Sequence, residues 1–433
     1  MRGNKILYSF GNLSAAVSNQ AFMTYITFFY VDAIKFPKAY FGLAWLFFGL
    51  WNAVNDPLFG QWSDRTRTRW GRRLPFMAVG ALPYALFFFL LWVPPAQHLT
   101  ERTLFYYLLG SMFLFDTFFT LVILNWTALF PEMYPSLAER ASVSAWRQVF
   151  GLIGLVLGMA VPPLLYGRYG WALMGLALAL VTLATTILSI LGSEEHPQPR
   201  PGGVGLLAAL RFTFTSRSFL AFAAANFGNY LAMGTVQATF AFFVKYVLRA
   251  ADQAQSLLMG TAFAVTLPML ALWRRVTIRY GARLAQIATA AVFGLVCLGF
   301  LVVDDLTGAL IVSGLLGIGL AGVMMLPDIL IADVVDEDEL RSGERREGMF
   351  FGVGGLAIRL AGALQGLVIM GVLGAFGYDA NAAVQTAAAI RGIRVLMSVV
   401  PLLAMALTAG AMYLYPLHGR RLAEVKKALS VSE

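Results

Sequence analysis

The stretch Trp51–Arg73, WNAVNDPLFGQWSDRTRTRWGRR, joins an apolar segment to a basic loop, and it sets how the rest of the chain is interpreted. Its first half carries Asn52, Asn55 and Asp56 among apolar residues, with a proline directly after the acid. An ionisable side chain inside an apolar segment of membrane length is costly and usually functional. The stretch therefore predicts a polar site inside a membrane-spanning helix.

The second half of this stretch indicates how the chain is oriented. It contains Arg65, Arg67, Arg69, Arg72 and Arg73. Short loops rich in Lys and Arg stay on the cytoplasmic side of a membrane. Most of the 32 Lys and Arg residues share the side of this loop if the N-terminus is cytoplasmic. Both termini are therefore predicted to be cytoplasmic. No nucleic-acid partner is expected, because the basic residues serve orientation.

The composition also indicates a membrane protein. The 433 residues are 59% hydrophobic and 13% charged, whereas a soluble domain is about 25% charged. A membrane-spanning helix needs about 20 mostly apolar residues. The chain contains twelve such segments, near 6–33, 40–62, 74–94, 103–130, 143–166, 170–191, 218–246, 254–273, 284–303, 307–331, 348–376 and 392–415. The sequence predicts an all-α, multi-pass membrane protein.

The twelve segments divide into two halves. A stretch rich in Pro and Gly predicts an N-terminal six-helix bundle (1–191), a cytoplasmic linker (192–217) and a C-terminal six-helix bundle with a short cytoplasmic tail (218–433). The sequence from Pro57, PLFGQWSDRTRTRWGRRLP, is echoed from Pro268, PMLALWRRVTIRYGARLA. Repeated six-helix units are typical of secondary transporters, in which one bundle rocks against the other. Alternating-access transport is the predicted function.

Catalysis is not indicated. His98, His196 and His418 lie in expected loops or the tail, so they suggest no metal site. The sequence has no G-x-x-x-x-G-K-[ST] phosphate loop, so ATP is not expected to drive transport. The single cysteine, Cys297, excludes an intramolecular disulfide. We expect neither an enzyme nor a cofactor, apart from Na⁺ or H⁺ as a coupling ion.

Four motifs carry a family resemblance. They are NDPLFGQWSDRTRTRWGRRLP from Asn55, PEMYPSLAERASVSAWRQ from Pro131, ADVVDEDELRSGERREGMFFGV from Ala332, and YPL at Tyr415. Together they resemble the glycoside–pentoside–hexuronide:cation symporters, the melibiose-permease-like branch of the major facilitator superfamily. The resemblance implies the major facilitator fold, with 12 transmembrane helices in two pseudo-symmetric six-helix bundles. It also implies sugar transport coupled to a cation in the bacterial inner (plasma) membrane.

The resemblance also implies a coupling site. The family often has two acids, one turn apart on the second helix, that can hold Na⁺ or a proton. These positions are Asn52 and Asp56 here, so only the second acid is kept. Thr120 matches a coupling-site threonine, and Arg359 replaces a lysine of the eleventh helix. One hypothesis is that Asp56 and Arg359 pair across the halves. The alternatives are a capping or packing acid at Asp56 and an anion-binding cation at Arg359.

Further polar and aromatic residues are candidates for substrate binding. The family's arginine of the fifth helix is kept as Arg147, which could contact substrate or form an inner gate. The other candidates lie in apolar segments and could line a sugar-sized cavity or merely join helices; they are Gln20, Tyr25, Asn125, Trp126, Asn229, Tyr230 and Gln365. The arginines favour an anionic substrate such as a hexuronide. Asp116 has two possible interpretations, as an acid that lines the cavity or as a buried, hydrogen-bonded acid.

Charged residues at the cytoplasmic ends of helices predict an inner gate. These residues are Asp64, Arg72, Arg73, Asp333, Asp336 and Arg345. Asp64 is expected to pair with Arg72 or Arg73 and to brace the second and third helices. The acids near Asp333 are expected to form a charge network with the following arginines, the alternative being a solvated loop.

Two other functions remain open. The nearest is a carrier of lysolipid-like amphiphiles with the same fold. The more distant is a transporter-like receptor or assembly factor that moves nothing. In every case the expected partners are membrane lipid and a small molecule. An anionic small molecule is the favoured interpretation. The chain is expected to be a monomer.

Overall fold

The computed structural model describes residues 4–432 apart from 67, 69–70, 97–98, 135–136, 196–215, 343–346 and 383. Within the helices, the side chains of several residues, Asp56 and Asp64 among them, are outside this description. Most of the predicted linker 192–217 and Arg345 are outside it too. The chain forms two compact units, each considered separately: unit 1 is Met1–Pro201 with Ala251–Ser256, and unit 2 is Gly202–Ala250 with Leu257–Glu433.

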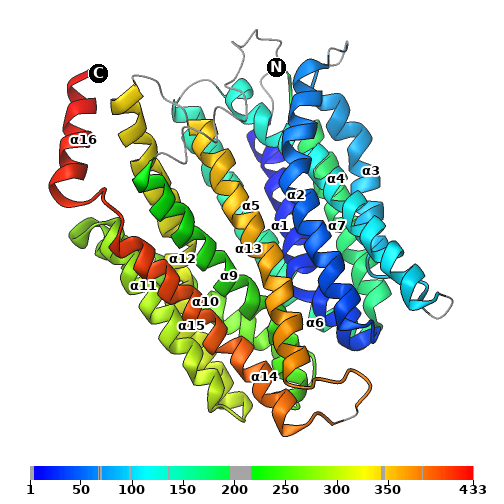
Figure 1. Cartoon of the computed structure of the whole chain (residues 1–433). Helices are drawn as coiled ribbons and strands as arrows, with labels where there is room; N and C mark the ends of the chain where they lie inside the picture. Colours follow the sequence, from blue (N-terminus) through cyan, green and yellow to red (C-terminus); the bar gives the residue numbers. More distant parts are fainter. Residues whose placement is uncertain are drawn as a thin grey trace. The chain divides into compact units, whose positions relative to one another are not determined.

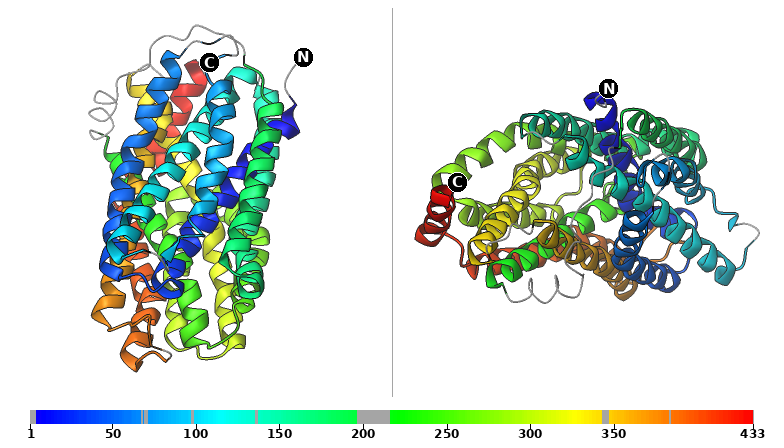
Figure 2. Two further views of the ribbon diagram at one scale, coloured as in Figure 1. Left: turned by 90° about the vertical axis from the view of Figure 1, so that its right-hand side faces the viewer. Right: turned by 90° about the horizontal axis from the view of Figure 1, so that it is seen from above.

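Unit 1 is a helical bundle. Its elements are α1 (Lys5–Phe28), which continues into the π-helical turn η1 (Phe29–Ala33), then α2 (Lys38–Arg65), α3 (Leu74–Leu90), α4 (Glu101–Met133), α5 (Leu137–Ala160), α6 (Pro162–Tyr169) and α7 (Trp171–Leu191). The helix α1 packs against α5 and α7, while α4 packs against α2 and α3 (Figures 1 and 2). The pair α2 and α4 therefore brings the quoted stretch against residues near 116.

Unit 2 is also helical. Its elements are α9 (Arg217–Phe242), the π-helical turn η3 (Phe243–Val247), α10 (Gln253–Tyr280), α11 (Ala282–Cys297), the 3₁₀ turn η4 (Leu298–Leu301), α12 (Leu306–Ser342), α13 (Glu347–Ala375), α14 (Ala387–Met397), α15 (Val399–Tyr413) and α16 (Gly419–Ser432). The helix α9 packs against α13 and α15, and α11 against α12 and α15. The predicted short tail is the helix α16, which packs on α12 (Figure 1).

The helical membrane fold is confirmed. Among the described residues, eight helices are long and apolar enough to cross a membrane, and α3 is a shorter apolar helix. Every predicted segment coincides with helix, although two of them are split, at Val161 between α5 and α6 and at Ser398 between α14 and α15. The number of helices that cross the membrane, predicted as twelve, stays a prediction.

The first helix of each unit ends in the same backbone arrangement. After η1, the N–H of Ile34 donates to the carbonyl of Phe29 at 2.8 Å, and Lys35 has φ of 65°. After η3, the N–H of Leu248 donates to the carbonyl of Phe243 at 3.1 Å, and Arg249 has φ of 50°. A non-glycine residue with positive φ is uncommon. Its recurrence at equivalent places supports the internal repeat that the sequence echo indicates.

Candidate functional site

A polar cluster joins α2 and α4 inside unit 1. Asn52 and Asn55 lie three residues apart on α2 and so share one face, while Asp116 and Thr120 lie one turn apart on α4. The amide nitrogen Nδ2 of Asn52 donates to Oδ1 of Asp116 at 2.6 Å, and Nδ2 of Asn55 donates to Oδ2 at 2.8 Å. Asn55 Nδ2 also lies 3.0 Å from both Thr120 Oγ1 and the Asp116 carbonyl. We call these four residues the amide–acid cluster.

The amide–acid cluster is buried, and aromatic residues flank it along α2 and α4. The Asp116 side chain is 4% exposed and Asn55 is fully buried. One turn before the acid, Phe113 stacks on Trp51, with ring centroids 5.2 Å apart. Phe115, the residue before Asp116, packs against Phe22, Tyr84 and Phe88. In such apolar surroundings a carboxylate depends on its hydrogen bonds, so Asp116 is the buried, hydrogen-bonded acid of the two alternatives.

The sequence predicted two members of this cluster, Asn52 and Thr120, but not the acid between them. Asp116 lies four residues before Thr120, and this helical spacing was the available signal. The sequence pattern could not show that Asp116 pairs with α2, because Asn52 and Asp116 are 64 residues apart in the chain. The position of the Asp56 side chain lies outside the described residues, so its predicted role stays a prediction.

A second cluster surrounds Arg147 on α5. Its guanidinium carbon lies 4.5 Å from the Trp126 ring centroid and 4.8 Å from that of Phe130. Tyr8 stacks on Trp126, its hydroxyl donates to the Trp126 carbonyl at 2.8 Å, and Trp126 Nε1 donates to the Tyr8 carbonyl at 2.9 Å. The Nε atom of Arg147 is buried and has no hydrogen-bond partner within the described part of the chain. This arginine is held by cation–π contacts, with a donor still available.

The other substrate-binding candidates of unit 1 are engaged in helix packing to differing degrees. Tyr25 is fully buried, and its hydroxyl donates to the carbonyl of Met159 on α5. Asn125 donates to the Leu121 carbonyl one turn earlier at 2.8 Å, while its Oδ1 is buried and has no partner among the residues described. Gln20 lies where α1 approaches Gly158 of α5 closely. Within the described residues, Asn125 is therefore the one of these three that has a buried acceptor without a hydrogen-bond partner.

The candidates of unit 2 mostly join helices. Asn229 accepts a hydrogen bond at 3.1 Å from Gln286, which links α9 to α11. Gln365 donates to the carbonyl of Gly234 at 3.0 Å, which links α13 to α9. Tyr230 is 43% exposed within the structure, and Arg359 lies on α13 with an intermediate exposure. Their predicted roles in substrate binding and coupling stay predictions.

The loop before α3 is closed by an acid that was not predicted. Both carboxylate oxygens of Glu195 accept backbone N–H groups: Oε1 from Arg72 at 2.9 Å, and Oε2 from Arg73 at 2.9 Å and Leu74 at 3.2 Å. The side chain of Glu195 is 4% exposed, and Gly71, which lies in this loop just before Arg72, has φ of 101°. Glu195 thus satisfies free N–H groups at a helix start. The predicted pairing of Asp64 lies outside the described residues.

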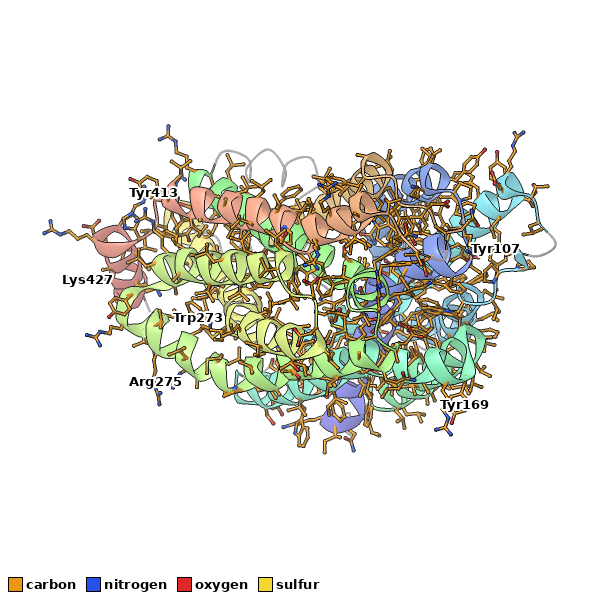
Figure 3. The ribbon with its side chains drawn as sticks, turned by 90° about the horizontal axis from the view of Figure 1, so that it is seen from below. Tyr107, Tyr169, Trp273, Arg275, Tyr413 and Lys427 are labelled. Carbon is orange, nitrogen blue, oxygen red and sulfur yellow. The ribbon has the colours of Figure 1, made fainter. Side chains whose placement is uncertain are left out.

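The acids of α12 are held by the C-terminal helix. Lys426 Nζ lies 3.0 Å from Asp333 Oδ1, and Arg421 forms an ion pair with Glu337. Both carboxylates are 6% exposed, whereas both cations are more than half exposed. Figure 3 shows Lys427 of α16 and Tyr413 at the end of α15 at one margin of unit 2. The sequence analysis expected arginines of the following loop as partners, and that loop lies mostly outside the described residues.

Long apolar helices in two compact units, with buried polar clusters inside the first, define a multi-pass membrane transporter. The chain belongs to the MFS/sugar transport protein family, whose model matches residues 7–419. This match confirms the resemblance to the symporter branch and the fold class. Since the relatives and structural neighbours are transporters, the prediction that the chain is not an enzyme is also confirmed.

Individual relatives match over different lengths. The chain is 25% identical to the isoprimeverose transporter of Lactiplantibacillus pentosus, over 94% of this chain and 87% of that protein. It is 35% identical to an uncharacterized symporter of Synechocystis sp. over 159 residues, which is 36% of this chain and 29% of that protein. It is 29% identical to the sodium-dependent lysophosphatidylcholine symporter 1-A of Danio rerio, over 36% of this chain and 29% of that protein.

A solved structure supports the same fold. A mutant of the nucleoside transporter NupG superposes with a TM-score of 0.71 at 13% identity, and the match covers 95% of this chain and 99% of that chain. At this identity the likeness concerns the fold alone.

Proposed function

We propose that this chain is a cation-coupled symporter that moves a sugar, a glycoside or a hexuronide-like solute by alternating access. The observation that carries this proposal is a hydrogen-bonded acid at 4% exposure, inside apolar helices, in a chain that belongs to a transporter family. Acids buried in membrane helices usually serve ion or substrate pathways. The full-length match to an isoprimeverose transporter supports the sugar class. The coupling ion is Na⁺ or H⁺.

We also propose that the substrate carries an anionic group. The support is Arg147, whose guanidinium carbon lies 4.5 Å from the Trp126 ring centroid and 4.8 Å from that of Phe130, while its Nε has no hydrogen-bond partner among the described residues. A guanidinium is charged at any relevant pH and presents a planar set of donors that matches a carboxylate. In this proposal Trp126 contributes a ring face, and Asn125, the residue before it on α4, contributes its Oδ1, which has no partner among the described residues.

The proposed organisation follows the sequence. Residues 1–191 and 218–433 form the two bundles that move against each other, joined by the linker 192–217. The protein resides as a monomer in a bacterial inner membrane with both termini in the cytoplasm. The basic residues in the loops and in α16 support this orientation.

Uptake into proteoliposomes tests the proposed function. The purified chain is reconstituted and offered a panel of glycosides, hexuronides and lysolipids under an imposed Na⁺ or H⁺ gradient. We expect accumulation of a sugar-class solute with one of the gradients, and stronger competition by a uronide than by the neutral sugar. Failure of every solute to accumulate under either gradient would contradict the symporter proposal and favour the receptor or assembly-factor alternative.

The second candidate function is a lysolipid-like amphiphile carrier. The partial match to a lysophosphatidylcholine symporter favours it, and a phosphate group would also suit Arg147. The same uptake panel separates the two functions, because a lysolipid would then accumulate in preference to every sugar. Binding of a lysolipid that the neutral sugar does not displace would give the same answer.

A further inference from the structure

Asp116 has an unusual set of partners for a buried acid. Both of its carboxylate oxygens accept hydrogen bonds from side-chain amides, Asn52 at 2.6 Å and Asn55 at 2.8 Å. Among the residues that the structure describes, no Lys, Arg or His forms an ion pair with it. A buried charge without a counter-charge is expensive even when it is hydrogen bonded. The buried cluster is therefore more stable if the acid can become neutral.

The amides are suited to both charge states of the acid. An asparagine side chain has two donors on nitrogen and an acceptor on oxygen, and a half-turn of the amide exchanges them. The Oδ1 atom of Asn55 is buried and has no hydrogen-bond partner among the residues that the structure describes. When Asp116 is charged, Nδ2 of Asn55 donates to it. When Asp116 is protonated, Oδ1 of the turned amide can accept a hydrogen bond from the new hydroxyl.

We propose that Asp116 is the proton-carrying acid of this transporter and that Asn52 and Asn55 hold it in both charge states. This inference rests on the proposed function and names its coupling ion as a proton. A proton from water forms the O–H bond at Oδ2 of Asp116, and the amide of Asn55 turns to accept it. Release to water on the other side breaks that bond and restores the amide donors. In the observed arrangement both oxygens of Asp116 face amide N–H groups, whereas a metal cation requires oxygen ligands.

Other titratable groups lie on the elements packed against α4. On α3, Tyr84 packs on Phe119. Its hydroxyl forms a hydrogen bond of 2.5 Å with the Ser18 hydroxyl and lies 3.2 Å from the Ser14 carbonyl, to which it can donate. On α1, the hydroxyl of Tyr25 donates a hydrogen bond to the Met159 carbonyl. On α2, Asp56 follows Asn55 in the chain, and its side chain lies outside the described residues. Asp56 is therefore the group that the test must separate from Asp116.

Infrared spectroscopy of the reconstituted protein tests the proposal without any substrate. The full chain in phosphatidylcholine vesicles is titrated with acid, and the carbonyl stretch of a protonated carboxylic acid is followed. We expect this stretch to contain one component band that appears reversibly on acidification, disappears in Asp116→Asn and is unchanged by added Na⁺. Glu101→Gln, an exposed acid at the start of the same helix, is the matched control and should leave the band in place. Because no transport is measured, an inactive symporter would not affect this result.

Two further variants keep the test decisive. If Asp116→Asn does not fold, Asp116→Glu retains a carboxyl group and should move the band in frequency. Asn52→Ala removes a donor to the charged form and should move the titration midpoint upward by about one pH unit. The proposal is overturned if the band survives Asp116→Asn, if Asp56→Asn removes it instead, if Na⁺ abolishes it at constant pH, or if no such band titrates.

Discussion

The two units bury their acids in different ways. In unit 1, Asp116 lies among aromatic rings, and its hydrogen bonds come from the neutral amides of Asn52 and Asn55. In unit 2, Asp333 and Glu337 lie near the end of α12 and are matched by the cations Lys426 and Arg421. Removing the proton from an acid held by amides, or returning it, breaks no ion pair. An acid matched by a cation loses its partner when it is neutralised.

This difference separates a group that can change its charge from groups that fix a structure. An amide stabilises a carboxylate as a donor and a carboxylic acid as an acceptor. A lysine or arginine stabilises only the carboxylate. We therefore expect substitutions at Asp116 to alter coupling, and substitutions in α16 to alter stability.

The largest effect should come from Asp116→Asn. The amide is nearly isosteric with the acid but cannot take up a proton. The imposed proton gradient can therefore no longer drive solute uptake. Solute accumulation in proteoliposomes should fall to passive equilibration, a ratio of about one, while solute exchange without a gradient continues. Glu101→Gln serves as the control. Full accumulation by the Asp116→Asn variant would remove the basis of the comparison.

A smaller loss, of stability, should follow from removing the cations of α16. Arg421→Ala and Lys426→Ala each leave a carboxylate that is 6% exposed without its partner. Because both cations are more than half exposed, we expect a loss of about 1–2 kcal/mol in free energy of unfolding for each. Thermal unfolding in vesicles measures this loss, with Arg420→Ala, which removes an exposed arginine from the same helix, as the control. Equal effects at positions 420 and 421 would show that the ion pair contributes nothing.

The sequence predicted much of the fold and part of the site, for separable physical reasons. Helices could be placed because each apolar run has membrane length, a local property of the chain. The helix α16 was predicted only as a short tail, since its stability comes from packing Val425 into the core of unit 2. The acid Asp116 was noticed but not assigned, because its partners lie on another helix. Glu195 was missed for the same reason, since its acceptor role appears only when the loop before α3 is folded.

Asn52→Asp sharpens the comparison by changing the type of partner. It replaces a donor 2.6 Å from Asp116 with a second acid. Two carboxyl groups at such a distance cannot both be charged, so one of them holds its proton more tightly. The infrared titration should then show two steps, separated by about two pH units, where the natural chain shows one. Asn52→Ala is the control, because it also removes the amide but adds no charge. A single unchanged step in Asn52→Asp would mean that the two side chains do not interact.

The smallest effect concerns a feature that the two units share. Lys35 and Arg249 both have positive φ after a π-helical turn, a conformation that costs a non-glycine residue about 1–2 kcal/mol. Glycine relieves this strain but gives the unfolded chain more freedom, which offsets about 0.5–1 kcal/mol. Lys35→Gly and Arg249→Gly should therefore each stabilise the fold by on the order of 0.5 kcal/mol, measured as a small rise in thermal midpoint.

The alanine variants at the same two positions complete this last comparison. Lys35→Ala and Arg249→Ala also remove the basic side chain, yet they keep the cost of positive φ, so they should show no gain. The difference in thermal midpoint between the glycine and the alanine variant should be similar at positions 35 and 249, because the backbone hydrogen bonds around both residues match. A gain at one position alone would mean that the repeated backbone is strained in only one unit. In that case the units would differ at the ends of their first helices as well as in how they hold their buried acids.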